Sequence, residues 1–322
     1  MILRCILTRC GLAAAVAFTC GTVVAQTYPT KPITLYVAYA PGGAGDIVSR
    51  AVARKMGESM GQPMIIENRP APMIAPSTVA KAKPDGYTLV MIGSGTALTQ
   101  VLFKNVPYDV MGDFQHVSSL ASFDLALLTS PDSKFKNVAD VIAFAKANPG
   151  KLNIGTVRIG STQHLTAEMF KSMAGIDAVI IPYKTTAEII SALRAKDVHV
   201  AFEILPTVLG QVAQKVIKPL AVTSNKRFFG LPDTPTVTEN GVPGFEASSW
   251  NGFSLPANTP RPIVDYLAKE IDKAVASPEV QKELQAIGMV ARSSTPEQMT
   301  EHVRSDMAKW KGVIDKANIS KQ

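Results

Sequence analysis

Cysteine is scarce in this sequence of 322 residues. Its three cysteines, Cys5, Cys10 and Cys20, all lie within the first twenty positions. If those positions are removed on export, the mature chain has no cysteine, which excludes disulfides, thiol catalysis and cysteine-ligated metal sites. Charged residues are also few, at 18% of the chain, whereas apolar residues make up 46%, and this balance excludes a largely disordered protein.

The first 25 residues have the pattern of a secretory signal peptide. Arg4 and Arg9 form a basic start, and an uncharged apolar run follows over residues 11–24. This run is shorter than the roughly 20 residues of a membrane-spanning helix, so we expect cleavage after Ala25 and not a retained anchor. Cleavage as a lipoprotein at Cys20 is the weaker alternative, because Thr19 stands where a small Ala or Gly is expected.

Clustered positive charge and clustered metal ligands are both missing from the sequence. The mature chain keeps 31 basic and 26 acidic residues without any run of four or more Lys or Arg, so we expect no nucleic-acid partner. A mild positive excess suits small anionic ligands, although ordinary solubility accounts for it equally well. The four histidines, at positions 116, 164, 199 and 302, are too far apart to suggest zinc ligation, and we expect neither a metal nor a cofactor.

No hydrolase motif occurs either. The sequence has neither the G-x-S-x-G nucleophile elbow nor the H-E-x-x-H metalloprotease pattern. Ser161 and His164 are three positions apart on one predicted helix, which leaves the imidazole alongside its own helix and favours Ser161 as a helix cap. We therefore do not expect an enzyme, and a secreted hydrolase is the least favoured alternative.

Strand and helix patterns alternate along the whole mature chain. Runs of β-branched and aromatic residues are followed by segments in which apolar residues repeat at helical spacing. Strands are predicted over residues 32–39, 64–67, 87–92, 117–129, 152–156, 178–181, 198–202 and 218–223, and helices over residues 46–56, 77–82, 138–147, 161–173, 187–195, 205–212, 262–276, 278–287 and 296–317. This alternation predicts an α/β fold with parallel sheets built from right-handed βαβ crossovers.

Two such α/β sets in one chain predict two lobes with a cleft between them. Residues 117–129 are the candidate crossing from the first lobe to the second, and residues 250–256 are the candidate return. We therefore assign residues 26–125 and 248–322 to the first lobe and residues 126–247 to the second, with the closing helices rejoining the first lobe.

Three glycine-rich turns join a predicted strand to a predicted helix, at residues 41–46, 93–96 and 156–161. The dinucleotide fingerprint G-x-G-x-x-G fails in the first two, because Val48 and Leu98 occupy the third glycine position, and no P-loop lysine is present. Successive N–H groups at a helix N-terminus bind anions without a charged side chain. The simpler alternative is that the glycines only permit tight turns; for three turns of the same chemistry, we favour an anion site.

Two charged residues fall at the predicted cleft. Arg158 lies in the third turn, where a guanidinium either grips a carboxylate through two hydrogen bonds or stays in solvent. Glu203 follows a predicted strand and either accepts a hydrogen bond from a ligand hydroxyl or ammonium, or favours the N-terminus of the following helix. Four aromatic residues sit at predicted strand ends, as a ligand wall or as core: Tyr39, Phe202, Trp250 and Phe253. For Trp250 we favour core or hinge.

Short motifs along nearly all of the mature chain resemble those of one family. They are Tyr28-Pro29-Thr30-Lys31-Pro32-Ile33, Pro41-Gly42-Gly43-Ala44-Gly45-Asp46, Gly61-Gln62-Pro63, Glu67-Asn68-Arg69-Pro70, Lys83-Pro84-Asp85-Gly86-Tyr87-Thr88-Leu89, Pro107-Tyr108-Asp109, Asn148-Pro149-Gly150-Lys151-Leu152, Gly160-Ser161, His164-Leu165, Pro182-Tyr183-Lys184, Leu220-Ala221-Val222-Thr223, Leu231-Pro232-Asp233-Thr234-Pro235-Thr236-Val237 and Gly241-Val242-Pro243-Gly244. This combination resembles the Bug-type periplasmic solute-binding proteins, which serve tripartite tricarboxylate transporters.

The resemblance implies a two-lobed Venus flytrap fold in which each lobe is a Rossmann-like, mostly parallel sheet flanked by helices. It implies a periplasmic, monomeric protein that binds a small carboxylate and delivers it to the membrane subunits of such a transporter. A ligand-presenting subunit for a two-component receptor is the alternative role. The resemblance places the site at residues 40–46 and 93–96 in the first lobe, and at the loop before Ser161 and the acidic residue after the strand at 198–202 in the second. Together with the residues discussed above, this gives the predicted ligand-binding residues Tyr39, Ala40, Gly42, Gly43, Ala44, Asp46, Ser94, Thr96, Arg158, Ser161, Thr185 and Glu203.

This sequence departs from the family pattern at four places. The family usually has glycine and serine at Val157-Arg158, glycine at Thr185 and Asp-Asn at Glu203-Ile204, and the loop over residues 71–76 replaces a glycine-rich stretch. All but the last fall in the second lobe, so we expect the carboxylate anchor of the first lobe to persist while distal specificity changes. The additional cation suggests a second anionic group on the ligand, such as an aliphatic or aromatic dicarboxylate.

Overall fold

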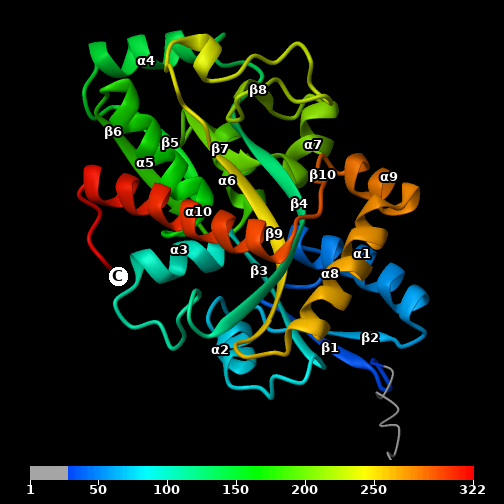
Figure 1. Ribbon diagram of the computed structural model, residues 1–322. Helices are drawn as coiled ribbons and strands as arrows, with labels where there is room; N and C mark the ends of the chain where they lie inside the picture. The colour runs from blue at the N-terminus through cyan, green and yellow to red at the C-terminus, as the bar shows by residue number, and fades with distance from the viewer. Residues whose placement is uncertain (1–27) are drawn as a thin grey trace, which may run out of the picture.

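The computed structural model describes residues 28–322, so the predicted signal peptide lies outside the described residues (Figure 1). The strands are β1 (Ile33–Val37), β2 (Met64–Asn68), β3 (Thr88–Gly93), β4 (Phe114–Thr129), β5 (Leu152–Val157), β6 (Ala178–Tyr183), β7 (Val200–Ile204), β8 (Lys218–Val222), β9 (Ser248–Pro256) and β10 (Val290–Ala291). The helices are α1 (Ala44–Met60), α2 (Ile74–Ala80), α3 (Ser94–Leu102), α4 (Val138–Ala147), α5 (Thr162–Ala174), α6 (Thr186–Ala195), α7 (Leu205–Ala213), α8 (Arg261–Ala276), α9 (Pro278–Ala286) and α10 (Pro296–Lys316), with a 3₁₀ turn at Thr238–Asn240. The predicted alternation of strands and helices is confirmed.

One mixed sheet runs through the molecule in the strand order β2-β1-β3-β9-β4-β7-β5-β6, with β8 and β10 also pairing with β4. The outer strands are parallel: β1 pairs with β2 and β3, and β5 pairs with β6 and β7. The central strands β4 and β9 are antiparallel to their neighbours. The prediction of mostly parallel sheets therefore holds for the outer strands only, because two long strands that cross between the α/β sets run against them.

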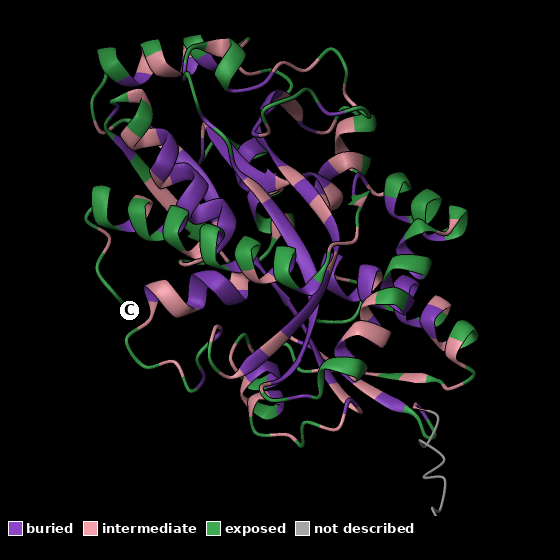
Figure 2. Cartoon of the chain, viewed as in Figure 1, coloured by how far each residue is buried: buried purple, intermediate pink, exposed green. Residues whose placement is uncertain are grey.

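Strand β4 joins the two halves of the sheet. Residues Phe114 to Asp124 pair with β9, and residues Leu125 to Thr129 pair with β7 and β8. The strand has 16 residues, begins three residues earlier than the sequence predicts, and is buried along most of its length (Figure 2). A strand buried on both faces has no polar–apolar alternation to mark its ends, which explains the missed start.

Helices cover both faces of the sheet, and their apolar sides form the cores. One core lies between α1, α8, α9 and strands β1 and β3, and another lies under α5 and α10 (Figures 1 and 2). Helix α10 crosses the middle of the molecule, and its Trp310 and Ile314 share that second core with Leu98 and Leu102 of α3 and Phe170 of α5. A helix late in the sequence thus packs against elements of both α/β sets.

Several local signals act as the sequence predicts. The last three helices each have a proline in their first turn, where its missing N–H costs nothing. Ser161 caps α5, and its hydroxyl accepts a hydrogen bond from the N–H of His164 at 3.1 Å. Trp250 is core: it is buried in β9, and its indole N–H donates to the Asp306 carboxylate at 2.9 Å.

Two predicted helix starts are wrong. Asp46 is the third residue of α1 and not its cap, because the helix begins directly after Gly43. Helix α2 begins at Ile74, three residues before the predicted start, although Pro76 follows within its first turn, a position that proline tolerates. The predicted turn at residues 93–96 is also not a loop, because α3 begins at Ser94, immediately after β3.

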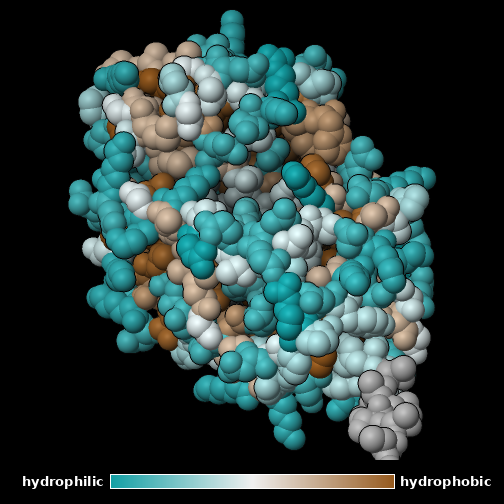
Figure 3. Space-filling view, in the orientation of Figure 1, coloured by the Kyte–Doolittle hydropathy of each residue, from teal (hydrophilic) through white to brown (hydrophobic). Residues whose placement is uncertain are grey.

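The surface seen in Figure 3 is mostly hydrophilic, and its apolar residues form separate groups and not one continuous band. Within residues 28–322, none of the helices is both long and apolar enough to cross a membrane. The same residues contain no cluster of three or more His, Cys, Asp or Glu placed to hold a metal ion.

Candidate functional site

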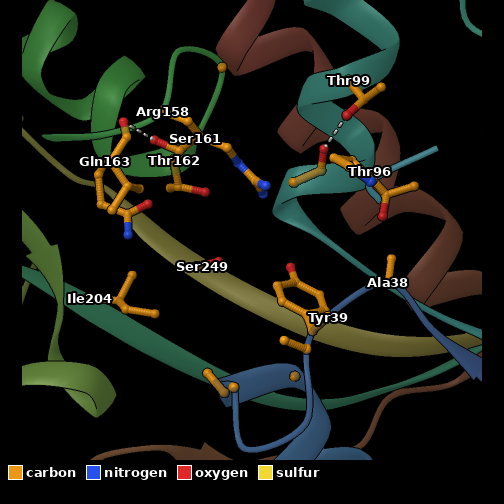
Figure 4. A pocket seen from close by; sticks show the side chains of 18 of the residues that line it. Ala38, Tyr39, Thr96, Thr99, Arg158, Ser161, Thr162, Gln163, Ile204 and Ser249 are labelled. Carbon is orange, nitrogen blue, oxygen red and sulfur yellow. Dashed lines mark hydrogen bonds between the residues drawn. The ribbon is translucent and has the colours of Figure 1, made fainter. Parts of the chain in front are cut away.

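A cavity of about 440 Å³ lies at the carboxyl ends of the strands, between the two α/β sets (Figure 4). Its walls come from both sets and its floor from β4 and β9. The residues that line it are Ala38, Tyr39, Ala40, Gly43, Ala44, Gly45, Pro72, Gly95, Thr96, Thr99, Phe103, Phe123, Val157, Arg158, Ile159, Gly160, Ser161, Thr162, Gln163, Lys184, Thr185, Thr186, Ile204, Ser249 and Asn251. The volume is sufficient for a small organic molecule.

Five helices of the described chain begin at this cavity. Cap or first-turn residues of α1, α3, α5, α6 and α7 all contribute to the lining. The first N–H groups of a helix have no partner within the helix and carry a partial positive charge. In the described part of the chain, the N–H groups of Ala44, Gly45, Thr162 and Gln163 make no hydrogen bond. The backbone alone therefore makes the cavity favourable for anions.

Asp46 holds the first of these helix ends in place. One of its carboxylate oxygens accepts hydrogen bonds from the Gly42 N–H at 2.8 Å and from Arg50 Nε at 2.9 Å, and the other accepts from Asn68 Nδ2 at 2.8 Å. Burial alone would raise the pKa of Asp46, but these three hydrogen bonds outweigh it and hold the pKa below its usual range. Asp46 is buried and does not line the cavity. It therefore acts indirectly, by holding the Gly42 N–H and so the turn before α1 in position.

Replacement of Asp46 by Asn should destabilise the protein. An amide has one acceptor oxygen where Asp46 has two, so its NH₂ group would face a donor, either Asn68 Nδ2 or the Gly42 N–H and Arg50 Nε. We therefore expect a loss of about 1–3 kcal/mol in the free energy of unfolding at neutral pH. Since the folded-state pKa of Asp46 is depressed, its contribution is present above the unfolded pKa of about 3.9 and is lost as the pH falls further. Urea denaturation at several pH values measures this.

The matched control is Asp233→Asn, because Asp233 is exposed and its side chain makes no hydrogen bond within residues 28–322. The free energy of unfolding of this control should equal that of the wild type over the whole pH range. The difference between Asp46→Asn and the wild type should shrink below about pH 4. A difference that is absent at neutral pH, or constant down to pH 2, would contradict the assigned role of Asp46.

Two cationic residues of the second set line the cavity. Arg158 lies in the turn between β5 and α5, and Lys184 in the turn between β6 and α6. Figure 4 shows the Arg158 guanidinium extending across the cavity toward Tyr39 and Thr96, and neither it nor Lys184 forms an ion pair with the described residues. No Asp or Glu of the described chain lines the cavity. Burial raises the pKa of Tyr39, an effect that the nearby Arg158 opposes, so the phenol stays neutral at pH 7.

The turn that carries Arg158 also touches the first α/β set. Gly160 has a φ of +79°, and a Cβ atom built on it would lie 2.7 Å from Leu102 Cδ2 and 3.4 Å from the ring of Phe103. Both residues are at the C-terminal end of α3. Only glycine combines this backbone angle with so close an approach, so Gly160 allows the two sets to pack closely beside the cavity through apolar contact.

Eight of the predicted ligand-binding residues line the cavity: Tyr39, Ala40, Gly43, Ala44, Thr96, Arg158, Ser161 and Thr185. Four do not, and for these the predicted direct contact is not what the structure shows. Gly42 and Asp46 lie behind the first turn, and the Ser94 hydroxyl points to β9, where it accepts from the Trp250 N–H at 3.2 Å. Glu203 is fully buried directly behind the cavity wall, where it is bonded to the lining residues Gln163 and Thr186 and covered from the cavity by them.

Other lining residues were not predicted. Gln163 and Thr186 each follow a predicted residue by one or two positions in the first turn of a helix, so extending each turn by two residues would have found them. Ser249 and Asn251 lie two apart on β9, and strand alternation would have placed them on the same face. Their contact with the first-set helix ends depends on the pairing of β9 with β3 and β4, which no local pattern reveals.

Two α/β sets around a cavity at the carboxyl ends of their strands define a two-lobed solute-binding protein. The chain belongs to the family described as the tripartite tricarboxylate transporter family receptor, which matches residues 48–319. This confirms the resemblance seen in the sequence motifs, and the predicted α/β fold with two lobes.

Individual relatives agree with the family assignment. Protein BugT of Bordetella pertussis is 32% identical over 308 residues, which cover 94% of each chain. The structure of R. palustris Rpa4515 with adipate has a TM-score of 0.82 at 33% identity, covering 91% of this chain and 99% of that chain. The structure of MatC from Rhodopseudomonas palustris with bound malate has a TM-score of 0.78 at 26% identity, covering 89% of this chain and 100% of that one.

Proposed function

We propose that this protein is an exported, periplasmic receptor that binds a small dicarboxylate between its lobes and delivers it to the membrane subunits of a tripartite tricarboxylate transporter. One observation carries the proposal: five helix N-termini and two cations face one cavity, and no acidic residue of the described chain lines it. A dianion is the ligand class that this combination favours, because each end finds positive potential in a different lobe.

The two lobes would hold the two carboxylates in different ways. In lobe one, N–H groups at the starts of α1 and α3 surround one end of the cavity, beside the Tyr39 hydroxyl. In lobe two, Arg158 and Lys184 face the same space with charged donors. Adipate and malate, named in the structures of two relatives, both carry two carboxylates, which supports this assignment.

Catalysis is not part of the proposal. Three of the hydroxyl groups at the cavity are bonded within the protein: Ser161 and Thr185 cap helices, and Thr99 donates to the Gly95 carbonyl at 2.8 Å. Within residues 28–322, no histidine lines the cavity that could act as a base toward them. A hydroxyl without a base is a weak nucleophile.

The lobes would move about the strands that join them. We assign residues 26–125 and 248–322 to lobe one and residues 126–247 to lobe two, with β4 and β9 as the connections. Since β4 passes from pairing with β9 to pairing with β7 near Asp124 and Leu125, the hinge would lie at that step.

Ligand binding should stabilise the folded protein in a way that depends on the number of carboxylates. At a concentration 100 times its dissociation constant, a dicarboxylate should add about 2.7 kcal/mol to the free energy of unfolding. A thermal-shift series of mono- and dicarboxylates of four to eight carbons measures this. Small-angle scattering should show a more compact particle at saturation. Stabilisation by monocarboxylates alone, or by none of the series, would refute the proposed ligand class.

A further inference from the structure

The wall of lobe two contains a buried carboxylate that the proposed binding mode does not use. Glu203, at the end of β7, is inaccessible to solvent, yet it is the partner of two residues that line the cavity. One oxygen accepts from Gln163 Nε2 at 3.1 Å, and the other accepts from Thr186 Oγ1 at 3.1 Å. The N–H of Ile204 also donates to it at 3.1 Å, whereas the Thr207 hydroxyl, 3.5 Å from the carboxylate, donates to the Ile204 carbonyl at 2.9 Å.

The Ile204 N–H can only donate, so the Glu203 oxygen that it contacts must accept, and the Gln163 amide that shares this oxygen must present its nitrogen to it. Burial raises the pKa of Glu203, an effect that the hydrogen bonds from Gln163, Ile204 and Thr186 oppose. Because the Gln163 amide gives its nitrogen to Glu203, its oxygen is left for the cavity. In Figure 4 the amide nitrogen of Gln163 points toward Ile204, next to Glu203, and the amide oxygen points toward Thr162 and Arg158. The Thr186 hydroxyl donates its only proton to Glu203, so toward the cavity it can only accept a hydrogen bond.

We propose that Glu203 sets the hydrogen-bond polarity of the lobe-two wall, so that Gln163 and Thr186 act there only as acceptors and select a ligand with a hydroxyl group beside its distal carboxylate. This inference rests on the proposed dicarboxylate function. Glu203 is a positioning residue, since it does not reach the cavity itself. Arg158 and Lys184 take the distal carboxylate, and the hydroxyl on the adjacent carbon donates to the wall.

A hydroxyl fits this wall better than the other common donor, an ammonium group. An ammonium beside the distal carboxylate would lie near both Arg158 and Lys184, and no acidic side chain of residues 28–322 lines the cavity to balance it. A hydroxyl donates one hydrogen bond without adding charge. A methylene in the same place would leave the buried Gln163 oxygen without a partner, which is costly.

Calorimetric titration with ligand pairs that differ by one hydroxyl tests the proposal. The pairs are succinate with malate, and adipate with 2-hydroxyadipate. The wild-type protein should bind the hydroxylated member about fivefold to tenfold more tightly, the net value of one neutral hydrogen bond. In Glu203→Gln, the new amide NH₂ replaces an oxygen that accepted a hydrogen bond from Gln163 or Thr186, so that residue must reverse its hydrogen bond and present a donor to the cavity. The ratio of the two dissociation constants in each pair should then fall to within about twofold of unity.

Two further variants make the result specific. Gln163→Met removes the amide acceptor from the wall and keeps the Glu203 side chain, and it should abolish the hydroxyl preference, so that both members of a pair bind with about equal affinity. Thr207→Val removes a long contact to the same carboxylate from a residue outside the cavity lining, and it should leave the preference at the wild-type value. If Glu203→Gln does not fold, Gln163→Met alone decides.

The outcomes separate this inference from the function on which it rests. If the wild type binds both members of a pair equally, or if Glu203→Gln and Gln163→Met weaken both members by the same factor, Glu203 is merely structural and the inference is wrong. If the wild type binds no member of either pair, the dicarboxylate function itself fails. A preference for the unsubstituted ligand would also overturn the inference.

Discussion

Arg158→Ala should weaken the binding of dicarboxylates much more than that of monocarboxylates. The Arg158 guanidinium faces the cavity and makes no ion pair with the described residues, so it is available to the distal carboxylate of a ligand. A charge-assisted hydrogen bond is worth about 1.5–3 kcal/mol, and its removal should weaken a dicarboxylate by about 10-fold to 150-fold. The same change should scarcely affect a monocarboxylate that occupies only the lobe-one helix ends.

The matched control for Arg158→Ala is Arg194→Ala. Arg194 is exposed near the end of α6 and does not line the cavity, so it removes the same charge from the same half of the molecule. Titration calorimetry with both ligand classes at two ionic strengths gives the comparison. Equal weakening of both classes by Arg158→Ala, or equal effects of the two variants, would mean that Arg158 contributes only to the general field of the protein.

Gly45→Ala should abolish binding of any carboxylate. A Cβ atom on Gly45 would lie 2.3 Å from Met91 Cε and 2.7 Å from Tyr39 Cδ2, so the Tyr39 ring must shift within the cavity that it lines. The shift would also disturb the start of α1, where the Ala44 and Gly45 N–H groups are open to the ligand. We expect a loss of affinity of at least 100-fold, measured by calorimetry.

Helix stability provides the control for Gly45→Ala. Gly312 lies within α10 with open space around its Cα, so Gly312→Ala should raise the melting temperature slightly, because alanine favours helix over glycine by about 1 kcal/mol. It should leave ligand affinity unchanged. If Gly45→Ala binds carboxylates as tightly as the wild type and its melting temperature rises as much as that of Gly312→Ala, the first turn of α1 is not part of the site.

The sequence predicts the elements of this fold better than their assembly. Glycine-rich turns, N-terminal prolines and the Ser161 cap are local signals, and the structure confirms the helices that they predict. The antiparallel insertion of β4 and β9 between parallel strands is a long-range pairing, since β4 and β9 lie more than 100 residues apart. No periodicity in either strand encodes its partner, so the mixed sheet could not be predicted from local pattern.

The candidate site likewise has parts that a local sequence pattern predicts and parts that depend on long-range packing. Backbone groups at helix starts were predicted because a glycine-rich turn marks them in the sequence. Asp46 and Glu203 were predicted to contact the ligand, but both are buried and neither lines the cavity. One position along a strand or within a helix turn decides whether a side chain reaches a cavity or is covered by its neighbours. Both buried carboxylates orient other groups, a role that depends on donors from distant segments.

The apolar contact between Gly160 and the end of α3 has a kinetic consequence. Any opening of the lobes at this point must part Gly160 from Leu102 and Phe103, which exposes apolar surface to water and slows the opening. A larger apolar contact at this loop would slow both the capture and the release of a ligand. The loop would thus raise the residence time of the ligand and lower the rate of its delivery.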